Sequence, residues 1–327
     1  MKRFGLRSIL LLGLLVWSSA AVWGQKDWKF VKPGVKSSAV ESGQMTQDQV
    51  DRYALHFWDG ENVELLETRL LSSEAEVALE AETQLANFFS VLLVATPDTS
   101  RKAVNNLMDR AGNSYQCIMD IAEKYLYNVQ SPYFSEDKFL LFLDHKIARS
   151  DIPEIEKSRE KYLAMLTRRN SVGGMAEDFT LYEIIGEFSG KITGKNVGSA
   201  GNDVETMYGF LGKLTERQSL MIVFFSAGCR DCIDGIVRLK HSSLLKKKIS
   251  EGELAVLAVC IEGKLSNVSS QIPVTWAAAS DGGAVMLNSL YSTRQTPSVY
   301  ILERSGEVVL KDASVSSAIQ FLLEQEE

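Results

Sequence analysis

The feature that most constrains the fold is a cysteine pair placed where a buried strand gives way to a helix. The apolar run at residues 220–225 predicts a strand that is buried on both faces, as in a parallel sheet. Cys229 and Cys232 follow it, and a helix is predicted from apolar residues at helical spacing, namely Cys232, Ile233, Ile236 and Val237. This strand–turn–helix layout around Cys-x-x-Cys is typical of a thiol–disulfide exchange site.

The position of Cys229 at the start of the helix predicts its chemistry. The first turn of a helix has unpaired N–H groups and the positive end of the helix dipole, so a thiolate is stabilised there. The thiolate is the species that attacks a disulfide. We therefore predict that Cys229 attacks and that Cys232 resolves the mixed disulfide. Of the residues between them, Arg230 favours the Cys229 thiolate and Asp231 opposes it, so both are predicted to tune the redox chemistry.

The N-terminus has the pattern of an export signal. Three basic residues precede an apolar run at 9–17, and small residues lead to Gly24. We expect residues 1–24 to be a signal peptide, and residues 25–43, which are polar and contain Pro33 and Gly34, to be a tether. The alternative is an uncleaved anchor, but a spanning helix needs about 20 apolar residues. No stable membrane span is expected after cleavage.

Composition narrows the function classes. The formal net charge is −7 and becomes −10 once the three basic residues of the signal are removed. The only basic cluster, at residues 246–248, sits late in a predicted helix, so we expect no nucleic-acid partner. Four cysteines in an exported chain of 327 residues do not make a disulfide-rich scaffold, and two of the four share one motif. This distribution favours redox chemistry.

Residues 44–170 are predicted to form an all-α domain. Helical patterns with plausible caps cover residues 46–58, 73–94, 97–111, 115–127, 138–148 and 153–168. His56 and His145 lack partners at metal-ligand spacing, so structural roles are expected. Cys117 falls in an apolar stripe and is predicted to be buried. The aromatic residues of this domain are assigned to its core, with a partner-binding groove as the alternative (Phe57, Trp58, Tyr125, Tyr127, Tyr133 and Phe134).

Residues 171–327 are predicted to form an α/β domain with a mixed central sheet and helices on both faces. Besides the strand before the cysteines, strands are expected at 176–181, 253–261, 296–303 and 308–312. Residues 186–203 are rich in Gly, Ser and Asn and predict a long loop or hairpin. Helices are expected after Cys229, at 284–291, and after a serine cap at Ser314 or Ser316.

The sequence around Cys229 and Cys232, together with Thr296-Pro297, resembles thioredoxin-fold thiol–disulfide oxidoreductases of the TlpA/ResA-like branch. The stretch at 176–181 is similar to the opening of that branch. The resemblance implies a cis Pro297 opposite the cysteines and a Thr296 backbone that binds the cysteine-containing segment of a substrate. Residues 56–58, 122–127 and 131–132 resemble an uncharacterised helical domain that precedes such domains in exported bacterial proteins. That second resemblance brings no known activity; the signal peptide, with the Gram-negative bacterial setting that the resemblance implies, predicts a periplasmic location.

Two positions depart from the family pattern. Gly228 stands where an aromatic residue usually precedes the first cysteine, which opens the site. Val223 stands where thioredoxins place a carboxylate, so proton transfer to and from Cys232 requires another base or water.

We therefore predict an exported thiol–disulfide oxidoreductase that exchanges disulfides with cysteine-containing exported proteins, without a cofactor or metal. Reduction is the direction that the resemblance favours, and it would require a membrane electron donor. The alternative is a non-catalytic secreted interaction module with a thioredoxin-like scaffold and a structural disulfide. A zinc knuckle would have to recruit Cys260 and His241, which are scattered, and Cys260 is expected to be inert. A peroxidase would use the spacing of Ser226 and Cys229, but Ile222 stands where that family has proline.

Overall fold

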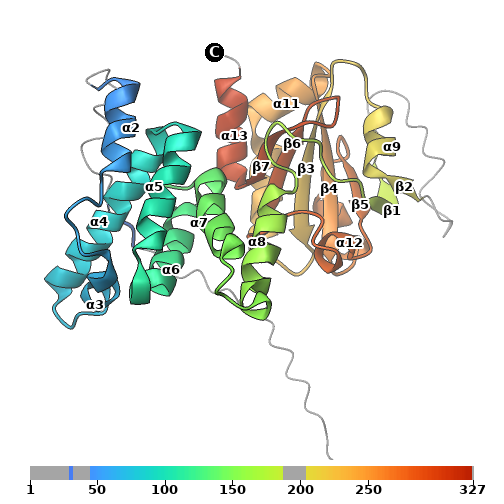
Figure 1. Ribbon diagram of the computed structural model, residues 1–327. Helices are drawn as coiled ribbons and strands as arrows, with labels where there is room; N and C mark the ends of the chain where they lie inside the picture. Colours follow the sequence, from blue (N-terminus) through green and yellow to red (C-terminus); the bar gives the residue numbers. More distant parts are fainter. Residues whose placement is uncertain (1–28, 32–44, 187–203, 326–327) are drawn as a thin grey trace, which may run out of the picture.

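The computed structural model describes residues 29–31, 45–186 and 204–325, and it has two parts (Figure 1). Helices form the N-terminal part and a sheet with its own helices forms the C-terminal part, with α7 and α8 on the side of the helical domain toward the sheet. The predicted signal peptide, most of the predicted tether and most of the predicted loop at 186–203 lie outside the described residues. The all-α and α/β classes predicted for the two parts are confirmed.

In the helical domain, residues with known capping roles mark where several helices begin. Thr46 caps the first with a reciprocal bond pair to Gln49, Pro97 occupies the first turn of another, and the Ser135 hydroxyl caps a third. The helices are α2 (Gln47–Leu55), α3 (Leu66–Leu70), α4 (Ala75–Val94), α5 (Pro97–Asp109), α6 (Tyr115–Leu126), α7 (Glu136–Ala148) and α8 (Ser158–Arg168), and short 3-10 turns cover Val63–Leu65, Gly112–Ser114 and Glu154–Lys157.

Two predictions for this domain are corrected. Pro153 is not inside the last helix, because its ψ of 145° is extended; a 3-10 turn follows it and α8 begins only at Ser158. Cys117 is half-buried instead of buried, because it lies beside the inward-facing stripe of α6 that Ile118 and Ala122 occupy.

The core of the helical domain surrounds α4. Within the described residues, α4 is the one helix that is long and apolar enough to cross a membrane, but Leu85, Phe88, Phe89 and Leu92 are fully buried against the other helices. The predicted core role of the aromatic residues is confirmed for Trp58, Tyr125 and Tyr133, which are at most 3% exposed. Part of the predicted tether also joins this core, since the ring of Phe30 packs edge-on against Tyr125 at 5.4 Å.

In the described residues of the C-terminal part, seven strands form one sheet in the order β2-β1-β5-β4-β3-β6-β7. The central strand β3 pairs in parallel with β4 and antiparallel with β6, so both of its edges are covered. The strands are β1 (Thr180–Ile185), β2 (Glu205–Thr206), β3 (Ser219–Ser226), β4 (Leu254–Glu262), β5 (Ala277–Ser280), β6 (Ser298–Leu302) and β7 (Val308–Ala313).

Helices cover both faces of this sheet, and alternate residues of β3 point into the two cores. Met221, Val223 and Phe225 face α10 (Arg230–His241), α11 (Ser243–Ser250) and α13 (Val315–Glu324). Leu220, Ile222 and Phe224 face α9 (Met207–Gly212) and α12 (Ala284–Leu287). Because α10 begins just after β3 ends, the cysteine pair lies at the carboxyl end of this interior strand.

Two strand predictions differ from the structure. The first strand begins at Thr180 instead of residue 176, and two strands of the sheet, β5 and the two-residue β2, were not predicted. The sequence of β5 is mostly alanine, which has little strand propensity, so its place between β1 and β4 depends on packing against the neighbouring strands.

Candidate functional site: a cysteine pair opposite a cis proline

Cys229 stands at the N-cap of α10, directly after the turn that follows β3. Its sulfur accepts a hydrogen bond from the backbone N–H of Cys232 at 3.1 Å, and the side chain is half-buried. A capping group is normally an oxygen that satisfies a free N–H of the first turn. Here the sulfur takes that place, so negative charge on Cys229 faces the positive end of the helix.

Cys232 lies one turn further along α10 and is fully buried in the core between the helix and the sheet. Burial raises the pKa of its thiol to about 12, and the hydrogen bond with Cys229 acts in the same direction. The pair is therefore asymmetric: one sulfur reaches the surface, while the other is held as a neutral thiol behind it.

Thr296-Pro297 faces this pair from the loop that precedes β6. The peptide bond between the two residues is cis. The Cys229 thiol donates to the Thr296 carbonyl oxygen at 3.8 Å, and the Thr296 hydroxyl donates to the Cys229 sulfur at 3.9 Å. The structure thus brings Cys229, Thr296 and Pro297 together, although 67 positions separate Cys229 from Thr296 along the chain.

The close approach of α10 to this loop depends on Gly235, which the sequence analysis did not single out. A Cβ at position 235 would lie 2.7 Å from Pro297 Cγ and 3.2 Å from Val315 Cγ2. Glycine inside a helix lowers helix stability, so its presence there is a sequence signal for a close contact. That signal would have identified the residue but not its partner.

Arg230 and Asp231 lie in the exposed first turn of α10. The residues that the structure describes include no hydrogen-bond or ion-pair partner for either side chain. Their effect on the sulfur chemistry therefore stays a prediction that depends on charge alone.

The surroundings of the pair bear on the alternatives. Ser226, the residue that the peroxidase alternative requires, donates to the Glu262 carboxylate at 3.2 Å, and Val223 is fully buried on the sheet face that Cys232 contacts. Burial raises the pKa of the Cys260 thiol, and His241 bonds to the Val237 carbonyl at the far end of α10. No group of three or more potential metal ligands is found in the described ranges.

The loop that carries Thr296 is folded around Asp312 of β7, a residue that the sequence analysis also missed. The Asp312 carboxylate accepts hydrogen bonds from Ser292 Oγ at 2.8 Å, Arg294 Nε at 2.6 Å and Ser298 Oγ at 2.6 Å. Asp312 is 1% exposed and its φ is +45°, a left-handed conformation that aspartate tolerates better than most residues. An isolated acidic residue in a strand gave no signal of this role.

Fold and site together define a thioredoxin-like domain with a Cys-x-x-Cys pair opposite a cis proline, preceded by a helical domain. A thioredoxin-like protein from Bacteroides caccae has a similar structure over 91% of this chain and 99% of its own, with a TM-score of 0.68 and 22% sequence identity. This likeness shows the fold of both parts of the chain.

Residues 39–170 match the family described as "Domain of unknown function (DUF5106)", so the predicted resemblance of the helical domain to an uncharacterised family is confirmed. A putative thiol:disulfide interchange protein, DsbE, from Chlorobium tepidum is also similar, with 20% identity, a TM-score of 0.34, and coverage of 48% of this chain and 94% of that one. The C-terminal domain of a putative thiol-disulfide oxidoreductase from Bacteroides thetaiotaomicron matches with 14% identity, a TM-score of 0.34, and coverage of 48% and 98%. None of the curated proteins matches the chain.

Proposed function

We propose that this protein is a thiol–disulfide oxidoreductase that acts on protein disulfides through Cys229 and Cys232. The observation that carries the proposal is the asymmetry of the pair: Cys229 is reachable and caps α10, while Cys232 is buried as a neutral thiol directly behind it. A nucleophile at the surface with a resolving thiol within one helical turn is what two-step exchange requires.

In the first step the Cys229 thiolate attacks one sulfur of the substrate disulfide. A bond forms between Cys229 and that sulfur, the substrate bond breaks, and the other substrate sulfur leaves as a thiolate. The half-buried Thr296 suits the binding of a substrate strand, because its carbonyl oxygen already lies beside the Cys229 sulfur.

In the second step Cys232 loses its proton and attacks Cys229. The Cys229–Cys232 disulfide forms and the second substrate sulfur leaves, so the substrate gains two electrons and the pair loses two. Because the pKa of Cys232 is about 12, a base or water must take the proton as the bond forms. Reduction is the proposed direction, and an exported oxidised thiol pool would reverse it.

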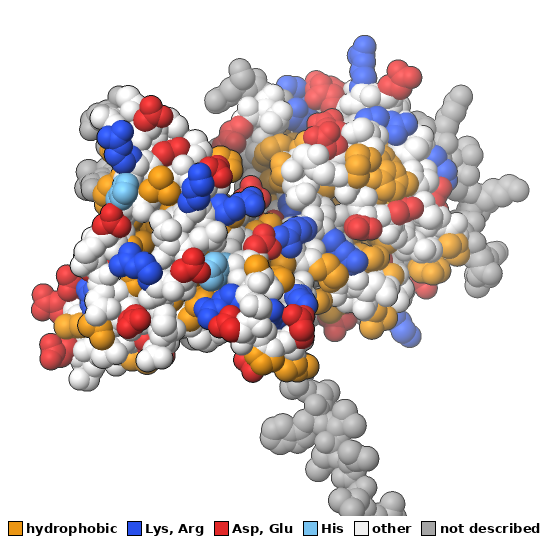
Figure 2. Space-filling view, viewed as in Figure 1, with side chains coloured by type: hydrophobic (Ala, Val, Ile, Leu, Met, Phe, Trp, Pro, Cys, Tyr) orange, Lys and Arg blue, Asp and Glu red, His pale blue; other side chains and the backbone are white. Residues whose placement is uncertain are grey.

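The location and partners complete the proposal. An N-terminal signal would place the protein in the periplasm, where its substrates would be cysteine-containing exported proteins and a membrane thiol donor would return the pair to the reduced state. The face in Figure 2 intersperses basic and acidic side chains over both domains. That mixed charge and the net charge of −7 favour protein partners over nucleic acid.

The proposal is tested with the full chain reduced by dithiothreitol and assayed for insulin reduction. The wild type is expected to turn over, and Cys229→Ser to fall to the background rate. Cys232→Ser is expected to accumulate a mixed disulfide with the substrate, visible by mass spectrometry. Cys117→Ser, which changes a half-buried thiol in the helical domain, is the matched control and should retain full activity.

The competing possibility is the non-catalytic module with a fixed disulfide. It predicts no insulin reduction, a Cys229–Cys232 bond that resists dithiothreitol, and no trapped intermediate in Cys232→Ser. Those three results together would replace the enzymatic proposal.

A further inference from the structure

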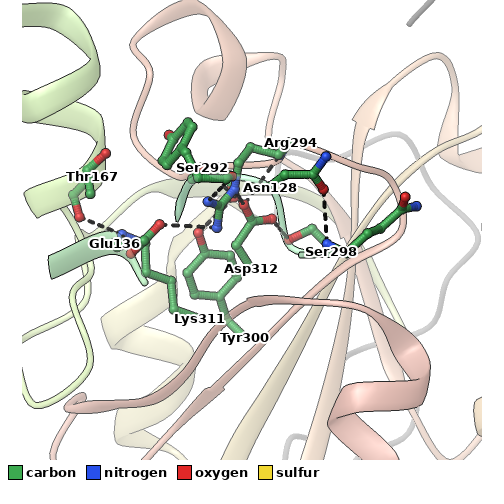
Figure 3. A network of polar contacts seen from close by, with 11 residues as sticks. Asn128, Glu136, Thr167, Ser292, Arg294, Ser298, Tyr300, Lys311 and Asp312 are labelled. Carbon is green, nitrogen blue, oxygen red and sulfur yellow. Dashed lines mark hydrogen bonds and ion pairs between the residues drawn. The ribbon is translucent and has the colours of Figure 1, made fainter. Parts of the chain in front are cut away.

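One buried side chain of the thioredoxin-like domain projects into the helical domain. Figure 3 shows Arg294, from the loop that precedes β6, beside Glu136 at the start of α7. Arg294 Nη2 lies 3.1 Å from Glu136 Oε1, and its Nη1 donates to the Tyr127 carbonyl oxygen at 3.3 Å. The guanidinium also lies 4.6 Å from the centre of the Tyr127 ring, a cation–π contact.

The other side of the same guanidinium holds the substrate loop. Its Nε donates to Asp312 at 2.6 Å, and Asp312 also accepts from Ser292 and Ser298, the two ends of the loop that contains Thr296-Pro297. Arg294 is only two residues from Thr296, whose carbonyl oxygen meets the Cys229 sulfur. A continuous set of polar contacts therefore runs from the helical domain to the loop that faces the attacking cysteine.

The charges of this network balance only when both domains contribute. Arg294 and Lys311 are the cations; Glu136 and Asp312 are the anions, and Lys311 Nζ lies 2.8 Å from Glu136 Oε2. All four side chains are at most 16% exposed. Removing the Glu136 charge would leave two buried cations facing one carboxylate, and a buried charge without a partner is strongly unfavourable.

We infer that Glu136 is a positioning residue: through Arg294, the helical domain holds the Thr296-Pro297 loop in the position from which it presents a substrate strand to Cys229. This assigns the helical domain a part in substrate binding, and the inference depends on the proposed function for its catalytic consequence. Glu136 acts through Arg294 and does not touch the reacting sulfur.

The test compares Glu136→Gln with Glu160→Gln in the full chain. Glu160 forms an ion pair with Lys146 at 2.7 Å that is more deeply buried and lies entirely inside the helical domain, so it controls for the loss of a buried charge. Two measurements are made: amide hydrogen exchange of peptides that cover residues 290–299, and KM and kcat for insulin reduction.

In Glu136→Gln we expect faster exchange in this loop and a KM raised by about 3- to 10-fold with kcat within about twofold, since coupled contacts of this kind carry modest energies. Glu160→Gln should leave the loop exchange and KM as in the wild type. Glu136→Asp keeps the charge on a side chain that is one methylene shorter, so its loop exchange and KM should lie between those of Glu136→Gln and the wild type. If Glu136→Gln does not fold, this intermediate change is the result that the inference requires.

Unchanged loop exchange in the Glu136 variants, or the same change in Glu160→Gln, would overturn the inference. An inactive wild type would instead overturn the proposed function, and hydrogen exchange would still decide whether Glu136 holds the loop.

Discussion

At the scale of single residues, the two cysteines differ because one helical turn separates surface from core. Cys229 caps α10 and contacts Thr296, whereas Cys232 points into the apolar layer between α10 and the sheet. Burial keeps the Cys232 thiol away from solvent, and its hydrogen bond with Cys229 places it beside the sulfur that it must attack as the resolving thiol. The position of each cysteine in the fold therefore decides which one attacks and which one resolves, since the two side chains are chemically identical.

Burial of Cys232 makes the stability of the reduced protein pH-dependent. Its folded pKa of about 12 lies above the ordinary value of 9.0, so between these values the unfolded chain loses the proton while the folded chain keeps it. The stabilisation is full below pH 9 and is lost as the pH rises toward 12, by up to about 1.4 kcal/mol per pH unit.

Urea unfolding of the reduced protein at a series of pH values from 8 to 10.5 would measure how the free energy of unfolding changes with pH. Cys232→Ala serves as the reference, because it retains the buried tyrosines that titrate in the same direction. The wild type should lose stability more steeply than the variant. If the unfolding free energies of the wild type and of Cys232→Ala change with pH in parallel, the folded state does not raise the pKa of Cys232.

At the scale of elements, the site depends on how closely α10 approaches the loop before β6. Gly235 contacts Pro297 across that gap, and the hydrogen-bonded neighbours β3 and β6 fix the starting points of both segments. The strand that ends before Cys229 and the strand that begins after Thr296 are neighbours in the sheet although they are distant in sequence.

Gly235→Ala should push α10 away from Pro297. The new Cβ, 2.7 Å from a rigid proline ring, costs about 1–3 kcal/mol as an overpacked contact. The gain in helix propensity of about 1 kcal/mol offsets only part of this. We therefore expect a net loss of unfolding free energy and slower insulin reduction, measured by urea unfolding and by turnover.

Gly212→Ala is the matched control, because nothing lies within 4 Å of a Cβ at that helical position. It should be neutral or slightly stabilising, with unchanged turnover. Equal stability of the two variants would mean that the contact between α10 and Pro297 is not tight.

At the scale of the whole molecule, the core of the helical domain is separate from the two cores on the faces of the sheet, and the two domains also meet through polar contacts. Besides the network around Arg294, Arg169 donates to the carbonyl oxygens of Asn288 and Ser289 at 2.9 and 2.7 Å. Asn170 stands where the helical domain ends, and its amide bonds the Leu290 carbonyl at 2.8 Å while its side-chain oxygen accepts from Glu177 N–H at 2.7 Å. These bonds set the orientation of one domain against the other.

Asn170 variants should separate two contributions to stability at this junction: the side-chain hydrogen bonds of Asn170 and its left-handed backbone conformation. The residue is 3% exposed with φ +49°, so Asn170→Gly loses both side-chain bonds but keeps the backbone, at a cost of about 1–3 kcal/mol. Asn170→Ala should lose about 1 kcal/mol more of unfolding free energy, because alanine disfavours the left-handed conformation. Thermal unfolding should rank the wild type above Gly and Gly above Ala, and equal values for Gly and Ala would show that the backbone relaxes.

Much of the fold could be read from local patterns. The strand before Cys229 and the helix starts at Thr46 and Pro97 depend on neighbouring residues only, and the structure has them where the patterns predicted. Local patterns did not predict strand β5, because its alanines form a strand only when they pair between β1 and β4. Helical periodicity predicts a helix at residues 154–157, where the structure has a 3-10 turn, because the periodic pattern does not distinguish the two.

The sequence by itself determined the two-part architecture and the cysteine pair at a helix start, since each follows from periodicity, capping residues or a motif, and the family resemblance implied the proline that faces the pair. Only the tertiary structure decided that Cys232 is buried while Cys229 is reachable, that Gly235 lets α10 approach Pro297, and that Glu136 meets Arg294 across the domain boundary. The physical reason is the distance along the chain over which each kind of interaction acts. Local patterns record what a residue does to its own turn of helix or strand, whereas burial and ion pairing depend on partners that the chain brings together only when it folds.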